Sequence, residues 1–274
     1  MTDKTGGVAG LPAAVPAAAA GEASPDRMLW WRLLSVALFC GAWEIAGQIP
    51  INFALPPFSR TMAAFFAMMA DGSMERAYLS TLQPLVIGVL ISAFLGVGLG
   101  VLIGLRRDAE WLIAPVFIVL QAAPMAALIP LITFIYGIGL AAKVLAVCLL
   151  ALPVIVLNSY KAVRNVNPSL VDMCRAFQGS RLQEVFKIVI PDASPLIFAG
   201  LRLGVAAGFI GVVLAELLIT PTGIGDLITY HRSVADYAEM YAVIASIIVF
   251  SAITLAALQR IEIALFRPET REAA

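Results

Sequence analysis

The residues whose side chains could do chemistry are few, and their spacing assembles no reactive group. The chain contains one histidine, His231. Its three cysteines, Cys40, Cys148 and Cys174, lie far apart and form no CxxC pair, so we expect neither a disulfide framework nor a thiolate metal site. No carboxylate pair lies at a useful spacing from a nucleophile or a metal ligand. The sequence therefore predicts no catalytic residue, no bound metal and no cofactor.

Glycine-rich stretches that could cradle a phosphate are incomplete. The chain has no GxxxxGK run followed by Ser or Thr, whose backbone N–H groups and lysine would hold the phosphates of a nucleotide. We interpret the fragments Gly137-Ile138-Gly139 and Gly223-Ile224-Gly225 as turns at helix ends. The formal net charge of 0 also argues against nucleic acid as a partner.

The composition places these residues in a membrane protein. Hydrophobic residues make up 61% of the 274 positions and charged residues 13%, against about 45–50% and about 25% in soluble proteins. The mean hydropathy is +0.94. A water-facing globule of this size could not bury so many apolar side chains, so the lipid bilayer must be the main solvent.

Six continuously apolar stretches are long enough to cross the bilayer, which takes about 20 residues of helix. Backbone groups in lipid must be satisfied within the segment, so we expect helices and an all-α fold. The stretches are 29–51, 82–105, 111–136, 141–160, 194–219 and 239–266. A short outer helix is also expected within 52–81, capped by Ser59 and ended by the turn Asp71-Gly72.

The basic residues predict the orientation. With the N-terminus inside, the outside segments contain only four of the 18 basic residues: Arg60, Arg76, Lys143 and Arg232. The positive-inside rule then places both termini in the cytoplasm. We expect a disordered cytoplasmic tail over 1–27, a transmembrane domain over 28–267 and a second cytoplasmic tail over 268–274. His231 is expected to be solvated in an outer loop, with contact to a delivery protein as the alternative.

The long cytoplasmic segment 161–193 is the most informative part of the chain. Pro168 and Ser169 suit the start of a helix. Gly179-Ser180 should end it, and a second amphipathic piece should run to Pro191. Its narrow apolar face comprises Leu170, Met173, Cys174 and Phe177. Two short helices with mixed charges suit docking on another protein or lying flat at the lipid surface.

This segment resembles the EAA loop of ATP-binding-cassette (ABC) importer permeases. The family pattern is Glu-Ala-Ala, three residues, Gly, nine residues and Ile-x-Leu-Pro. Asp172-Met173-Cys174 matches its start, Gln178 stands at the glycine position with Gly179 one residue later, and Ile188-Val189-Ile190-Pro191 matches its end. Asp replaces Glu, and Met-Cys replaces Ala-Ala.

The resemblance covers residues 29–266 and is closest to the nitrate, sulfonate, taurine and bicarbonate branch of these permeases. The matching stretches outside the loop are Trp43-Glu44, Leu55-Pro56, Ala127 to Leu131, Phe134, Gly137 to Gly139, Ser180 to Leu182, Ala199 to Gly204, Ala215-Glu216 and Gly223 to Gly225. The implied fold is that of a type I importer permease in a bacterial inner membrane, with six transmembrane helices and a cytoplasmic coupling helix.

The resemblance also implies the partners. Family members form dimers with a second permease copy or a paralogue, and a periplasmic solute-binding protein delivers the small-molecule solute. The short loop helix sits on a separate ATPase subunit, so this chain would not itself hydrolyse ATP. The implied docking residues are Leu170, Asp172, Met173, Cys174, Arg175, Phe177, Gln178 and Gly179.

Polar and kinking residues inside the spans suggest where a solute would pass. Gln121, Pro124, Pro130 and Phe134 lie in the third span, where prolines free backbone carbonyls that can line a cavity. Plain kinking is the alternative. Glu216, near the outer end of the fifth span, could line the path or gate it, because carboxylates at membrane depth tend to face cavities or partners.

Glycines four residues apart predict close helix packing. Such stripes let helix backbones approach each other, either as static packing or as a sliding surface. With Ser92 as the one small residue that is not glycine, they comprise Gly88, Ser92, Gly96, Gly100 and Gly104 in the second span and Gly200, Gly204 and Gly208 in the fifth.

Two other functional classes are alternatives to the permease. A self-sufficient secondary transporter or channel predicts inverted repeats or several buried charges for ion coupling, and neither is evident. An intramembrane enzyme needs a nucleophile–base pair or a metal cluster within the spans. The permease interpretation alone accounts for the loop, the spans and the missing nucleotide site.

Overall fold

The computed structural model describes residues 25–49, 54–219 and 221–266, and every regular element among them is helical. This confirms the all-α expectation. The elements are α1 (Pro25–Gln48), α2 (Phe58–Ala70), α3 (Ser73–Leu105), α4 (Arg107–Ala122), α5 (Met125–Tyr136), α6 (Leu140–Arg164), α7 (Pro168–Ala176), α8 (Arg181–Glu184), the π-helical turn η1 (Val185–Val189), α9 (Ile190–Leu218), α10 (Ile224–Ser233) and α11 (Tyr237–Phe266). The tails expected at 1–27 and 268–274 lie almost wholly outside the described residues.

Four segments of the described chain are long and apolar enough to cross a membrane: Ser73–Leu105, Leu140–Arg164, Arg181–Leu218 and Tyr237–Leu265. The helix expected over 111–136 is not continuous. α4 and α5 meet at an angle of 102°, and the pair counts as a fifth span only as a broken one. Pro124 lies at the break, where it lacks the N–H that would continue the helical ladder.

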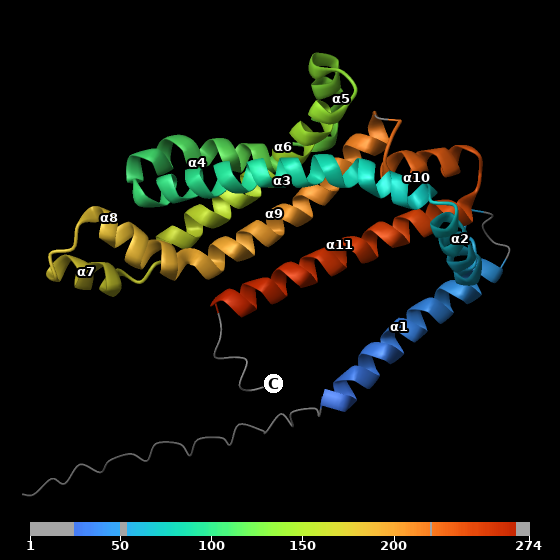
Figure 1. The fold of residues 1–274 in the computed structure, drawn as a ribbon, viewed down its shortest axis with the longest axis horizontal. Helices are drawn as coiled ribbons and strands as arrows, with labels where there is room; N and C mark the ends of the chain where they lie inside the picture. The colour runs from blue at the N-terminus through green and yellow to red at the C-terminus, as the bar shows by residue number, and fades with distance from the viewer. Residues whose placement is uncertain (1–24, 50–53, 220, 267–274) are drawn as a thin grey trace, which may run out of the picture.

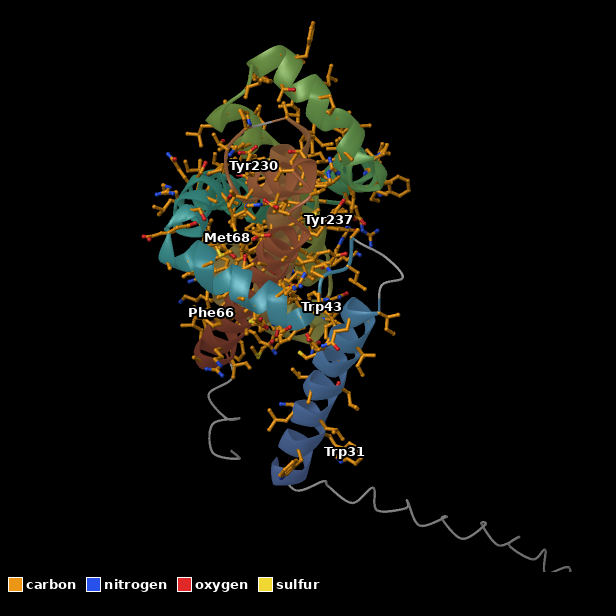
Figure 2. All side chains as sticks on the ribbon, turned by 90° about the vertical axis from the view of Figure 1, so that its right-hand side faces the viewer. Trp31, Trp43, Phe66, Met68, Tyr230 and Tyr237 are labelled. Carbon is orange, nitrogen blue, oxygen red and sulfur yellow. The ribbon has the colours of Figure 1, made fainter. Side chains whose placement is uncertain are left out.

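The first expected span forms a helix, α1, but it is not among these four or five candidates. Its C-terminal part contacts α2 and, through Trp43 and Tyr241, the start of α11, and the rest of α1 diverges from the bundle (Figure 1). Figure 2 shows Trp31 far from the bundle and Trp43 beside it.

The core consists of α3, α6 and α9, which pack along most of their lengths. The predicted glycine stripes lie at these contacts. A Cβ built on Gly100 would lie 2.5 Å from the Cβ of Ser159, and one on Gly204 would lie 2.3 Å from Cγ1 of Ile155. Since real side chains do not approach so closely, these glycines set the separation of the helices. The close-packing expectation is confirmed.

The short helix α2 is capped by a residue from another helix. We expected Ser59 to be its cap, but Ser59 lies inside the helix, which begins at Phe58. Glu44 of α1 instead accepts hydrogen bonds from the Ser59 backbone N–H at 2.8 Å and from its hydroxyl at 2.9 Å. The expected end is confirmed, with Asp71 at the C-cap and Gly72 at φ 71°.

The bundle has two distinct ends in Figure 1. α7 and α8 lie together at one, which we call the α7 end. α2 and α10 lie at the other, which we call the α10 end. Between them, α5 projects from the side of the bundle, and its Ile129 is buried against Ala146 of α6 and Ala215 of α9.

Candidate functional site

The helix α7 begins where the sequence predicted. Pro168 occupies its first turn, and the side chain of Asn167 accepts a hydrogen bond from the Ser169 backbone N–H at 3.0 Å. This cap was not singled out from the sequence, although Asn is a favoured N-cap residue. Val171 packs against a buried cluster that includes Val166 and Val189, which fixes the helix to the bundle.

The helix α7 ends in a Schellman motif. The Gly179 N–H donates to the carbonyl of Cys174 at 2.9 Å, and the Gln178 N–H donates to that of Arg175 at 3.0 Å. Gln178 takes the left-handed position with φ 56°, which glycine adopts without strain. A Cβ on Gly179 would lie 2.5 Å from Sγ of Cys174. The chain thus keeps the turn despite Gln178 at the family's glycine position, and Gly179 provides room for it.

The next turn is tied back to α7. Ser180 and Gln183 form a reciprocal capping box at the start of α8. Arg175 donates to both oxygens of Glu184, from Nε at 3.2 Å and from a terminal nitrogen at 3.1 Å. Hydrogen bonding to Glu184 raises the pKa of the Arg175 guanidinium. Helix α7 and the turn after it therefore form one rigid element.

The α7 end presents large apolar side chains to its surroundings. Phe177 is 82% exposed and Leu182 71% exposed; Phe186 and Met173 are also exposed. No residue of α7 is buried. Of the eight predicted docking residues, Leu170, Cys174 and Gly179 are half-buried and the other five are exposed. We define the docking surface as Met173, Phe177, Leu182 and Phe186.

At the other end, the structure shows a buried ion pair. Nζ of Lys143 lies 2.8 Å from Oε1 of Glu216, and their side chains are 4% and 0% exposed. Lys143 also donates to the carbonyl and the hydroxyl oxygen of Thr222, each at 3.0 Å. The sequence counts Lys143 among the outside charges but does not indicate that its side chain is buried. Only the fold brings it to Glu216, 73 positions later.

The remaining acceptors of Glu216 are also occupied. The hydroxyl of Thr81 in α3 lies 2.9 and 3.0 Å from its two oxygens, and the Gly225 N–H donates to Oε2 at 3.1 Å. A Cβ on Gly223 would lie 2.1 Å from Oε1 of Glu216. Gly223 caps α10, which confirms a turn at a helix end, and the absence of its side chain leaves room for the carboxylate.

The proposed path residues fall into two separate places. Gln121, Pro124, Pro130 and Phe134 all lie on the α4–α5 bend and are exposed, with Phe134 at 88%. Glu216 lies elsewhere, closed within the network of α3, α6, α9 and α10. The structure therefore places the four residues of the expected third span together on the α4–α5 bend, and Glu216 lies apart from them.

The described residues 221–238, where the sequence predicts an outer loop, contain a regular helix. Residues Ile224–Ser233 form α10, and the side chain of His231 is only 13% exposed. The expectation of a solvated histidine is wrong, because α10 turns this side chain toward the start of α11.

Comparison with known proteins agrees with this arrangement. Residues 92–266 match the family described as "Binding-protein-dependent transport system inner membrane component". The riboflavin transport system permease protein RibX of Chloroflexus aurantiacus is 28% identical, over 71% of this chain and 73% of its own length. The nitrate import permease protein NrtB of Leptolyngbya laminosa is 29% identical, over 74% of each chain.

The fold is similar to a solved structure. A chain of the MetNI methionine ABC transporter in an inward-facing conformation matches with a TM-score of 0.61 and 19% identity. The match covers 71% of this chain and 96% of that one. At this identity the likeness shows the fold.

Proposed function

Because the chain belongs to the family of binding-protein-dependent transport system inner membrane components, we propose that it forms the solute path of an ATP-driven importer for a small anion. The family is without catalytic activity, so ATP is hydrolysed by a separate subunit. The chain is a multi-pass inner-membrane protein that works with an ATPase and with a binding protein.

The docking surface at the α7 end carries this proposal. Large apolar side chains exposed on a rigid loop have no partner within the described chain and suit a protein groove. The eight predicted residues from Leu170 to Gly179 make up the coupling helix and its turn, and we assign them to the contact with the ATPase. The bridge from Arg175 to Glu184 lets this element transmit a push without bending.

We place the solute path along the α4–α5 bend. Gln121, Pro124, Pro130 and Phe134 are exposed on this unit, and a second permease copy or a paralogue would enclose them. Glu216 stays in the proposal at the outer end of the path. Its carboxylate is buried and held by Lys143, Thr81 and the Gly225 N–H, so we assign it the role of joining the helices that bound the path.

For the topology we propose six spans, with α1 as the first and the bent α4–α5 pair as the third. The α7 end then faces the cytoplasm together with both termini, and the α10 end faces the binding protein. The permease domain covers 28–267 and contains the coupling loop 161–193. A span count of six satisfies the parity that the basic residues require.

The solute class rests on relatives and is the least specific part of the proposal. NrtB is a nitrate permease, which supports a small anion such as nitrate, a sulfonate or taurine. RibX is a riboflavin permease at similar identity, so family membership alone does not decide the solute. Selectivity in such a system lies largely with the delivery protein.

Reconstitution tests the function. Proteoliposomes that contain the purified chain alone should take up no solute under an ion gradient. Uptake should require the ATPase, the binding protein and ATP. Uptake should stop when ATP is replaced by a non-hydrolysable analogue. Gradient-driven uptake by the chain alone would contradict the proposal and favour a self-sufficient secondary transporter or channel.

A further inference from the structure

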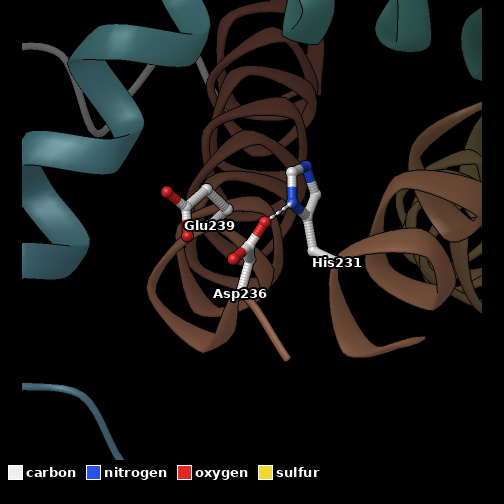
Figure 3. A group of neighbouring side chains, drawn as sticks. All are labelled: His231, Asp236 and Glu239. Carbon is white, nitrogen blue, oxygen red and sulfur yellow. Dashed lines mark ion pairs between the residues drawn. The ribbon is translucent and has the colours of Figure 1, made fainter. Parts of the chain in front are cut away.

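The turn between α10 and α11 brings three metal-ligating side chains together (Figure 3). His231 comes from the last turns of α10, Asp236 from the turn, and Glu239 from the first turn of α11. One ligand atom from each lies within 4.8 Å of the others. The Asp236 N–H donates to the carbonyl of His231 at 2.9 Å, which fixes the two residues relative to each other.

The imidazole of His231 is held in this cluster with one nitrogen unsatisfied. Nδ1 is buried and has no hydrogen-bond partner among the described residues. It faces Oδ2 of Asp236 at 3.9 Å, which is too long for a hydrogen bond. A buried nitrogen without a partner costs free energy. A cation between Nδ1 and the carboxylate would satisfy both groups.

The charges around His231 favour a cation. Asp236 and Glu239 face it from the turn and from α11, and Asp71 faces it from the end of α2. The basic groups nearby are Arg76, which lies beside Asp71, and Arg232, the neighbour of His231 in sequence.

We infer that His231, Asp236 and Glu239 bind a divalent transition-metal ion, with zinc as the best match. One imidazole and two carboxylates suit zinc, and water would complete its coordination. Ligand atoms around tetrahedral zinc lie about 3.4 Å apart, so the carboxylates need only small rotations to close the site. The sequence predicted no metal, because the ligands at 231, 236 and 239 follow no familiar spacing.

A route for the ion is present. Asp236 and Glu239 also line a cavity of about 420 Å³ between the end of α1, the start of α2 and the start of α11, whose other polar side chains are those of Gln48, Arg60 and Tyr237. An ion could therefore reach the ligands without opening of the bundle. Bound zinc would join α10 to α11 at the α10 end.

The zinc content of the purified chain tests this proposal directly. The full chain, purified in detergent with a streptavidin-binding tag instead of polyhistidine, is equilibrated with zinc chloride, dialysed and analysed by elemental mass spectrometry. We expect one zinc ion per chain, and none in His231→Gln. The matched control is Asp226→Asn, which removes a carboxylate from α10 outside the cluster and should keep the ion.

A second variant guards against misfolding. The side chain of Asp236 is 56% exposed, so Asp236→Asn should fold normally. It should weaken zinc binding by at least about tenfold, since even changes around a metal's ligands cost that much. Zinc retained equally by the unchanged chain, His231→Gln and Asp236→Asn would overturn the proposal, as would zinc absent from all of them. Neither result bears on the permease function, which is tested by ATP-driven uptake.

Discussion

Lys143→Met is expected to lower the free energy of unfolding by about 3–5 kcal/mol, the usual effect of removing one partner of a buried ion pair. The variant leaves the Glu216 carboxylate, whose side chain is 0% exposed, with only Thr81 and the Gly225 N–H as hydrogen-bond partners. Thermal unfolding in detergent, followed by tryptophan fluorescence, measures the loss. Glu216→Gln should be destabilising for the converse reason, since it leaves the Lys143 ammonium without a counter-charge.

Two further variants separate a buried charge from a general loss of contacts. In Lys143→Met combined with Glu216→Leu no charge is left unpaired, so this double variant should recover much of the stability lost by either single change. Arg175→Met is the matched control, because it breaks an exposed ion pair with Glu184 and should cost about 1 kcal/mol or less. A Lys143→Met chain no less stable than Arg175→Met would contradict the structural role assigned to the pair.

Phe177→Asp is expected to have the largest effect on transport. Phe177 is, at 82%, the most exposed residue of the docking surface, and aromatic anchors of this kind contribute about 2 kcal/mol or more to an interface. Each 1.4 kcal/mol is a factor of about ten, so affinity for the ATPase should fall by about 30-fold or more. Co-purification with the ATPase and ATP-driven uptake in proteoliposomes should both decrease, while the amount of chain in the membrane stays the same.

The control for this variant lies one residue away. Gln178→Gly places glycine at the left-handed position, φ 56°, and leaves the apolar surface intact. Because Gln178 contributes to the contact through its place in the turn, which glycine keeps, ATPase binding and uptake should be preserved. Full coupled transport by Phe177→Asp would show that Phe177 does not contact the ATPase. Loss of transport in both variants would indicate damage to the turn instead of to the docking surface.

Local features were predictable from the sequence. Pro168 begins α7 and Gly179 follows its end, because these residue types have strong preferences at helix termini. The glycines of α3 and α9 predicted close helix packing, since a missing side chain has the same consequence in any bundle. Such signals lie within a few residues or recur along a single helix.

Features that depend on distant residues were not predictable. Nothing beside Lys143 indicates that it pairs with Glu216, because only the packing of α6 against α9 brings them together. The sharp bend at Pro124 also exceeds an ordinary proline kink. His231 was missed as a cluster residue because its ligand partners lie across a helix boundary.

If an ATPase binds the α7 end, it should cover the side chain at position 177, and the accessibility of that side chain tests this most directly. Phe177→Cys, made in a chain with Cys40, Cys148 and Cys174 replaced by alanine, is labelled with a maleimide before and after addition of the ATPase. Tyr230→Cys at the exposed α10 end is the control. We expect the ATPase to slow labelling at 177 and to leave labelling at 230 unchanged. An ATPase that binds and supports transport while labelling at 177 stays as fast as in the free chain would contradict the account.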